Sequence, residues 1–537
     1  MPAGRILSRA GEEARPRGGT VTHVCPHDSR FGLLARGRCP EGARIPVRAG
    51  LVAALVGSSL AWGALGCGRD QVEIISAIPN GEAGIDAGAA TCSSNLADRL
   101  RVFDISVGKS IAWQKYGYDG FPFDERVALA VQPTGEGYIA WGEVNPKAAT
   151  DPTAPSPLGV HVTPVDANFA RAGADVILPD GLEVSGLVAH DNGFAVLVRV
   201  LDPGQAIAIG DNGDFPTIAS LVRYKNGQQA WQAYLTGSLS QDAAETQTVY
   251  SPFLEGQLVW SDSTYGAYFV VRGGTTDGNP AFWRDALVFR DSFGQPAPLS
   301  VTHGCSNNGG VRLIPDPNKV NLSGTANQPE MTGLCVQQSR VAVKLTALEN
   351  DQTVSDQEVH WSGYSGAKLG SLVKTADGYL VFWLSLGASN DHTGHDIRMA
   401  RFDNSFNLVA GPTWLTRTPN VEEWNLHVVP YGNNQFLMIY GEIAITGPAD
   451  DTDWAMYLGN YSGLRMKIIA ADGTTLAQTE NPIQGAPTTA NAEPVVLPDG
   501  SVAWAFVNPT PDYSQVITGP NGPGQTTLHL ARVCFAQ

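Results

Sequence analysis

The sequence predicts an all-β fold, a β-propeller in which four-stranded antiparallel sheets, or blades, stand around a common axis. Short runs rich in Val, Phe, Trp and Leu alternate with Asp-Gly and Asn turns, a pattern typical of β-hairpins. The same order of turn, apolar run and second hairpin recurs at a step of roughly 60 residues. Because such sheets are apolar on both faces, repeated copies must stack against one another to bury them.

Residues 371–416 show one complete unit. Two apolar runs flank the turn 376–378, a polar loop follows, and two further runs flank a turn at Asp403. Turn glycines such as Gly378 and Gly500 are expected to need positive φ. The unit predicts four strands, over 371–374, 379–386, 397–402 and 408–415.

The second run of each unit ends on a large apolar residue, and these residues mark the repeat. They are Trp141, Val198, Val271, Trp383, Tyr440 and Trp504, with a weaker copy around Cys335. A regular position in a strand favours packing in the core over sugar stacking. We expect this for Trp141, Trp260, Trp383 and Trp504.

Counting these units predicts seven blades, with six as the alternative. The last unit has a third strand and no fourth, while residues 96–108 are strand-like and unassigned. We therefore expect this N-terminal strand to complete the last blade and close the ring. The pairing would bring Cys92 beside Cys534, where a disulfide would lock the ring, and Cys305 with Cys335 is the natural second pair.

Three segments precede the propeller, which is expected over 96–537. Residues 1–46 are rich in Arg, Gly and Pro without periodicity, so we expect them to be untranslated or disordered, with translation starting at a valine such as Val47. Residues 47–66 carry one positive charge and then an apolar run, as in a signal peptide. Residues 67–95 are small and polar, which predicts a flexible tether.

The signal segment ends in Ala64-Leu65-Gly66-Cys67, which resembles a bacterial lipobox. The resemblance implies that Cys67 is diacylated and that membrane lipid is a partner of this end of the chain. Since Gly68 rather than an aspartate follows the cysteine, it also implies an outer-membrane lipoprotein of a Gram-negative bacterium.

Charge excludes one class of partner. The formal net charge is −17, and without residues 1–66 the chain holds 26 basic and 48 acidic residues, a net charge of −22. So acidic a surface repels nucleic acid, which we do not expect as a partner. We expect a monomer.

The unit within 258–302 reads LVWSDSTYGAYFVVRGG and then ALVFRDSFGQPAPLSVT. It resembles the repeat of secreted or lipidated bacterial β-propellers of an uncharacterised lipoprotein type. The resemblance extends over most of 126–537 and implies the fold, with no assigned chemistry. WD40, kelch and complete Asp-box signatures do not occur in the sequence.

Two loops offer ligands for a divalent cation such as calcium, although a solvated surface loop also explains each of them. Long loops also hold aromatic residues that suit ligand binding. The metal candidates are Asp391, His392, His395 and Asp396 in one loop and Asp450, Asp451 and Asp453 in the other, and the aromatic candidates are Trp283, Trp454 and Tyr513.

The sequence contains no nucleophile elbow, HExxH helix or phosphate loop, so no catalytic residue is assigned. We expect a non-catalytic binding or scaffold module for a glycan, peptide or protein, held outside the cytoplasm and binding through its long-loop face. The alternative is a secreted carbohydrate-active enzyme of propeller fold, either a glycosidase or a polysaccharide lyase.

Overall fold

The computed structural model describes residues 92–112, 127–144, 159–203, 217–237, 239–241, 256–261, 263–273, 282–303, 311–315, 331–337, 344–347, 368–385, 393–404, 407–448, 457–489, 492–511 and 525–535. All of them belong to one compact unit, residues 86–537. Within the described residues every regular element is a strand apart from the 3-10 turn η1 (Ala97–Arg99). None of these residues forms a helix long and apolar enough to cross a bilayer.

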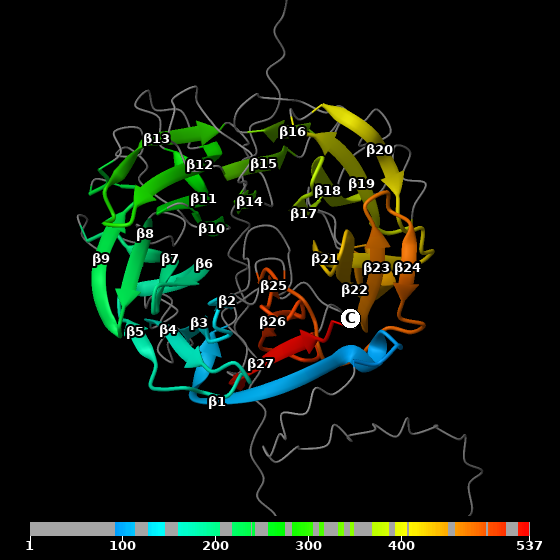
Figure 1. Cartoon of the computed structure of the whole chain (residues 1–537), viewed down its shortest axis with the longest axis horizontal. Coiled ribbons are helices and arrows are strands. Elements are labelled where there is room, and N and C mark those ends of the chain that lie inside the picture. The colour runs from blue at the N-terminus through cyan, green and yellow to red at the C-terminus, as the bar shows by residue number, and fades with distance from the viewer. Residues whose placement is uncertain are drawn as a thin grey trace, which may run out of the picture. The chain divides into compact units, whose positions relative to one another are not determined.

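The described strands form six antiparallel sheets, which follow one another in chain order around a common centre (Figure 1). Four sheets have four strands each, paired in sequence order. The first of them consists of β6 (Gly181–His190), β7 (Gly193–Leu201), β8 (Thr217–Lys225) and β9 (Gln228–Tyr234), and the second of β10 (Gly256–Ser261), β11 (Thr264–Gly273), β12 (Phe282–Asp291) and β13 (Pro296–His303). The third consists of β17 (Lys368–Lys374), β18 (Gly378–Ser385), β19 (Asp396–Asp403) and β20 (Leu408–Trp414). The fourth consists of β21 (Val421–Pro430), β22 (Gln435–Pro448), β23 (Tyr457–Ala470) and β24 (Thr475–Gln478).

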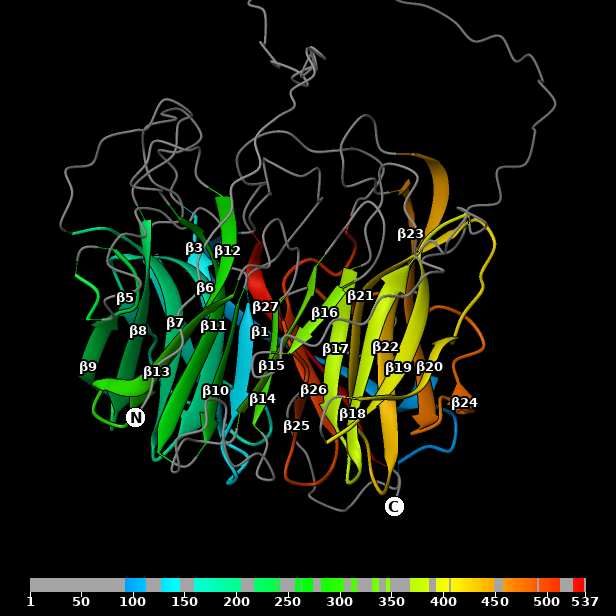
Figure 2. The same cartoon turned by 90° about the horizontal axis from the view of Figure 1, so that it is seen from above.

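The two remaining sheets depart from this pattern. One has three described strands, β14 (Val311–Pro315), β15 (Met331–Gln337) and β16 (Lys344–Ala347). The other combines the first five and the last three described strands in eight strands, and Figure 2 shows the same arrangement from above. Its members are β1 (Leu100–Ala112), β2 (Ala128–Val131), β3 (Gly137–Glu143), β4 (Gly159–Val165), β5 (Val176–Leu178), β25 (Val495–Val496), β26 (Val502–Phe506) and β27 (Gln525–Val533).

Strand β1 carries the link between the two ends of the chain. It pairs with β27 from Leu100 opposite Val533 to Ile111 opposite Gln525, and Ile111 and Ala112 also pair with β3. The sequence places this strand at 96–108, but it begins four residues later because Asn95 Oδ1 accepts the Ala97 N–H and a short turn forms first.

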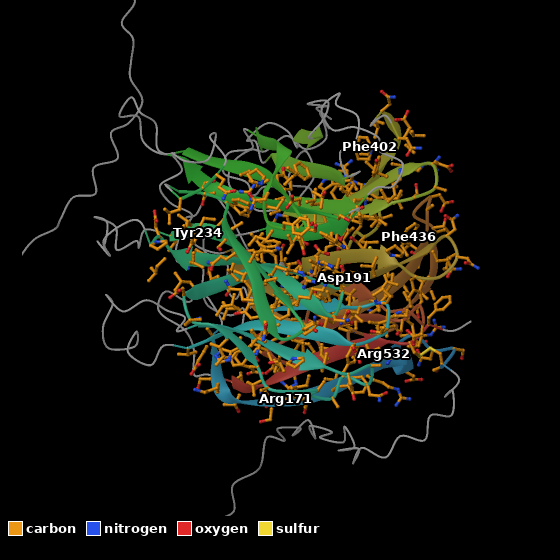
Figure 3. The ribbon with its side chains drawn as sticks, turned by 60° about the vertical axis from the view of Figure 1, so that its left-hand side comes forward. Arg171, Asp191, Tyr234, Phe402, Phe436 and Arg532 are labelled. Carbon is orange, nitrogen blue, oxygen red and sulfur yellow. A yellow bond between two sulfur atoms is a disulfide. The ribbon has the colours of Figure 1, made fainter. Side chains whose placement is uncertain are left out.

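A disulfide joins Cys92 to Cys534 in this region, as the sequence predicts. Two arginines also make hydrogen bonds at β1 and β27, and Figure 3 labels both. Arg171 Nη1 donates to Ser106 O of β1, and Arg532 of β27 donates through Nε to Ser501 Oγ. Cys305 lies outside the described residues and the side chain of Cys335 is not described, so the second pair stays a prediction.

The strands of 371–416 confirm the sequence pattern to within a few residues at each end. Gly500 has the expected positive φ of 81°. For Gly378 the expected reason is wrong: its φ is not positive, but a Cβ there would lie 1.9 Å from Phe402 O of the neighbouring strand. Glycine is needed at this turn for close backbone approach.

The core lies between neighbouring sheets, as expected from strands that are apolar on both faces. Trp141, Trp383 and Trp504 are buried at 2% exposure or less, which confirms their predicted role in packing. Trp260 differs, because it is only partly buried and stacks on His190 with ring centroids 4.1 Å apart.

Candidate functional site

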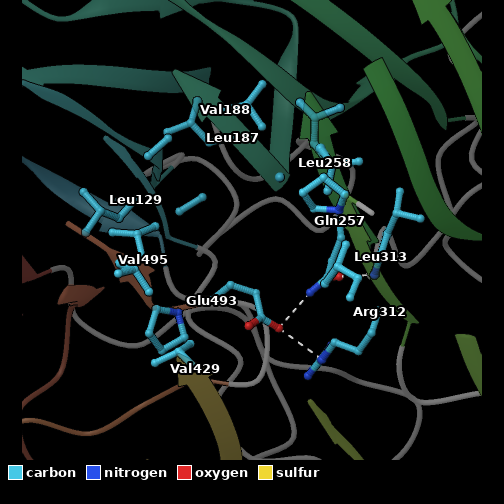
Figure 4. A pocket seen from close by; sticks show the side chains of 18 of the residues that line it. Leu129, Leu187, Val188, Gln257, Leu258, Arg312, Leu313, Val429, Glu493 and Val495 are labelled. Carbon is cyan, nitrogen blue, oxygen red and sulfur yellow. Dashed lines mark hydrogen bonds and ion pairs between the residues drawn. The ribbon is translucent and has the colours of Figure 1, made fainter. Parts of the chain in front are cut away.

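The inner strands of the sheets enclose a cavity of about 610 Å³ at the centre of the unit, which we call the axial pocket (Figure 4). This volume lies within the range of pockets that bind small molecules. Its wall comes from seven segments, 128–131, 185–189, 256–260, 312–315, 371–374, 428–430 and 493–496.

Most of the wall is apolar. Aliphatic side chains from five different inner strands face the cavity, and Figure 4 labels them. The inner strands supply them because each is the edge strand of its sheet, so consecutive residues of one strand lie along the cavity. They include Leu129, Leu187, Val188, Leu258, Val429 and Val495.

The polar end of the pocket is built around the carboxylate of Glu493, which stands just before β25. Gln257 Nε2 donates to Glu493 Oε1 at 2.7 Å, and Arg312 Nε lies 3.1 Å from the same oxygen. Arg312 Nε also donates to Gly370 O at 2.7 Å. These contacts fix the carboxylate against β10 and β14, while 34% of the Glu493 side chain stays exposed.

A histidine of β21 contacts Glu493 from behind the cavity wall. His427 is fully buried, and its Nδ1 lies 3.4 Å from Glu493 Oε2 while its Nε2 lies 2.7 Å from Thr489 O. Burial alone would raise the pKa of Glu493, but the positive charges of Arg312 and His427 and the hydrogen bonds outweigh it and hold this pKa below its ordinary value. Glu493 is therefore an ionised carboxylate facing a pocket.

The pocket runs along the axis from this polar end to the opposite ends of the inner strands. Gln257 and Arg312 lie near the starts of their strands, whereas Trp260 and Lys374 lie near the ends, next to the tight hairpin turns. The sequence placed binding on the long-loop face, so the described cavity adds a site that reaches toward the tight-turn side.

Two of the predicted metal candidates are described, and both are sealed in the protein. His395 and Asp396 are at most 2% exposed, and His395 Nδ1 lies 2.7 Å from Glu422 Oε1. Thr418 N donates to Asp396 Oδ1 at 2.8 Å. No group of three or more His, Cys, Asp or Glu residues within the described ranges is placed to hold a metal ion.

The other candidates cannot be placed. Trp283 lies in β12, but its side chain is not described. Those outside the described residues are Cys67, Asp391, His392, Asp450, Asp451, Asp453, Trp454 and Tyr513.

A second acidic residue lies beside the His395 and Glu422 pair. Glu423 is fully buried and accepts a hydrogen bond of 2.6 Å from Thr416 Oγ1. Burial, reinforced by the nearby Asp396 carboxylate, raises the pKa of Glu423 to about 8. At neutral pH the Glu423 carboxyl group is therefore protonated, and it is buried between the sheet of β17 to β20 and the sheet of β21 to β24.

Sequence reasoning missed the four residues at the polar end of the pocket, although they share a signal. Each stands directly before the apolar residues of its inner strand, as in Gln-Leu-Val, Arg-Leu-Ile, His-Val-Val and Glu-Pro-Val. A polar residue at the same point of several repeats indicates a common position near the axis. The four are Gln257, Arg312, His427 and Glu493.

No family model matches this chain, and no curated protein matches it. Solved structures do match. A protein of unknown function from Dyadobacter fermentans DSM 18053 is 11% identical, with 80% of this chain and 99% of that chain covered and a TM-score of 0.38. An α-L-arabinanase from Penicillium chrysogenum, complexed with arabinobiose, is 9% identical, with 80% and 98% covered and a TM-score of 0.35.

A polysaccharide lyase, the PL25 ulvan lyase, is 8% identical, with 60% of this chain and 76% of that chain covered and a TM-score of 0.35. Two of these three structures are carbohydrate-active enzymes, the class of the alternative function predicted from the sequence. Because every TM-score is below 0.5, these likenesses carry no argument about chemistry. The sheets around the axial pocket themselves define a β-propeller.

Proposed function

We propose that this protein binds a saccharide in its axial pocket. One observation supports this proposal most strongly: the pocket has an aliphatic wall, and at one end of it Glu493, Gln257 and Arg312 form a polar group held in place by its own contacts. A sugar ring has the matching character, since its C–H face is apolar and its hydroxyls are hydrogen-bond donors and acceptors. Pockets with an apolar wall and a few fixed polar groups are typical ligand sites.

The polar end favours an uncharged hydroxyl over an ammonium group. An ionised carboxylate has about four acceptor positions, and Glu493 uses two of them on Oε1. Arg312 already balances its charge, so a ligand cation would gain little. A hydroxyl can donate to Oε2, whose neighbour His427 Nδ1 lies 3.4 Å away, because the Glu493 side chain is 34% exposed.

A binding function is our first candidate because Glu493 is the one carboxylate among the described residues of the pocket wall. Glycoside hydrolysis ordinarily uses two carboxyl groups on either side of the scissile bond. The second candidate is a carbohydrate-active enzyme. It is favoured by the ionised carboxylate beside an imidazole, a pair that can transfer protons.

One experiment separates the candidates. The purified protein is titrated with arabinobiose, xylobiose, cellobiose and digalacturonate, and incubated with the parent polysaccharides while products are followed over time. Saturable binding without product supports the binding function, and product release supports the enzyme. Glu493→Gln should weaken either response at least about tenfold. Absence of both responses, or a Glu493→Gln protein that behaves as wild type, would remove the axial pocket as the site.

For the whole domain we propose seven blades, the last completed by β1, and an outer-membrane address through lipid on Cys67. The pairing of β1 with β27 and the Cys92–Cys534 disulfide support closure, and the disulfide also suits an oxidising compartment. Deleting 96–108 should broaden the unfolding transition and lower its midpoint. Cys67→Ser should move the protein from the detergent phase to the aqueous phase.

A further inference from the structure

The orientation of His427 fixes one of its two protons. Its Nε2 faces Thr489 O at 2.7 Å, and a carbonyl oxygen only accepts hydrogen bonds, so Nε2 carries a proton in both charge states of the ring. The other nitrogen, Nδ1, faces Glu493 Oε2 at 3.4 Å. Nδ1 therefore donates to the carboxylate when the ring is protonated, and presents a lone pair to it when the ring is neutral.

The other groups that face Glu493 do not change in this way. Arg312 of β14 and Gln257 of β10 both contact Oε1, and neither changes its charge near neutral pH. Glu493 itself stays ionised, since its pKa lies below the ordinary value. Only the surroundings of Oε2 thus depend on pH, and Oε2 belongs to a side chain that is one third exposed.

We propose that His427 is a positioning residue of the axial pocket, whose imidazolium form holds the Glu493 carboxylate in the orientation that receives saccharide hydroxyls and whose neutral form releases it. This inference rests on the proposed function. The affinity for an uncharged saccharide then falls as the pH rises and Nδ1 loses its proton. Two acceptors facing each other at this distance repel, so Oε2 loses its donor and is held less firmly once Nδ1 loses its proton, while Gln257 and Arg312 keep Oε1 in place.

The test measures the affinity for arabinobiose, which does not titrate, at a series of pH values from about 5.5 to about 8, the range in which histidine changes charge. The wild-type affinity should fall about tenfold across this range. His427→Gln removes the titration while its amide can still donate to Thr489 O, so its profile should be flat. His529→Gln is the matched control, because His529 pairs with Asp104 on β1 and β27, away from the pocket wall, and should keep the wild-type slope.

A wild-type slope in His427→Gln, or a flat wild-type profile, would overturn the role of His427. Thermal unfolding of each variant shows whether it is folded. If His427→Gln does not fold, His427→Asn is measured in its place.

A measurement without ligand tests the role of His427 separately from saccharide binding. The ring signal of His427 is followed by NMR against pH in the wild-type protein and in Glu493→Gln. Removing the carboxylate should move the midpoint of the His427 signal to lower pH. An unchanged midpoint contradicts the inference even if saccharides bind. A shifted midpoint with no saccharide bound upholds the pairing, but leaves the pocket without the ligand we propose.

Discussion

Two histidine and glutamate pairs in this propeller have the same chemistry and opposite surroundings. His395 and Glu422 lie 2.7 Å apart with both side chains fully buried. His427 and Glu493 lie 3.4 Å apart, and the glutamate keeps 34% of its side-chain surface exposed. The first pair is sealed between two sheets, whereas the second lies at the wall of a cavity. Access to a cavity, rather than the identity of the side chains, therefore distinguishes the two pairs.

The difference follows from where each glutamate sits on the backbone. Glu422 is inside β21, where the preceding sheet covers it and His395 N also donates to its Oε2 at 2.8 Å. Glu493 stands before β25, where the chain turns in toward the axis and no strand partner covers it. A buried pair must satisfy both partners internally, while a cavity-facing carboxylate can exchange a partner for a ligand.

The largest expected effect is on stability, and it differs between the two pairs. Glu422→Ala removes the acceptor of a buried histidine and of its backbone N–H, so the free energy of unfolding should drop by about 3–5 kcal/mol. Glu493→Ala leaves Gln257 and Arg312 at the wall of a cavity that admits water, and His427 keeps its contact with Thr489 O, so the drop should be about 1 kcal/mol. Denaturant unfolding of both variants at neutral pH measures the difference. Equal losses would contradict the contrast between the pairs.

The sealed region should also respond to pH through Glu423. Its pKa is about 8 in the folded protein and near the ordinary value of 4.5 when unfolded. Between these values the folded state holds a proton that the unfolded state has lost, so stability falls as the pH rises through this window. Glu423→Gln should unfold like the wild type near pH 4 but be more stable by up to a few kcal/mol at pH 8. A variant that is less stable at both pH values would argue for an ionised, paired Glu423.

A smaller effect is expected at the polar end of the pocket. Gln257→Ala removes a hydrogen bond of 2.7 Å to the Glu493 carboxylate and the acceptor of the Leu313 N–H. A hydrogen bond to a charged group contributes about 1.5–3 kcal/mol, part of which water in the cavity replaces. Affinity for arabinobiose should fall about fivefold while the melting temperature changes little. A large fall in melting temperature with unchanged affinity would assign Gln257 to folding alone.

Much of the fold could be predicted because its signals are local. A turn at 376–378 and apolar runs on either side define β17 and β18 without any distant residue. The pairing of β1 with β27 could also be predicted, because the last repeat unit lacks its fourth strand and the N-terminal region contains one unassigned strand.

The candidate site was not predictable in the same way. Gln257, Arg312, His427 and Glu493 come from four separate segments, and their contacts depend on how the sheets are arranged around the axis. The polar sequence around His395 predicts a metal site in a loop. The structure instead pairs His395 with Glu422, which follows 27 residues later. Side-chain chemistry alone does not distinguish a sealed position from an accessible one.

The most direct test of the central claim is a crystal structure of the protein soaked with arabinobiose, or with whichever disaccharide of the panel binds most tightly. We predict density for the sugar in the axial pocket, with a hydroxyl donating to Glu493 and a C–H face against Leu187 or Leu258. Sugar bound elsewhere on the propeller, with the axial pocket holding only solvent, would contradict the account.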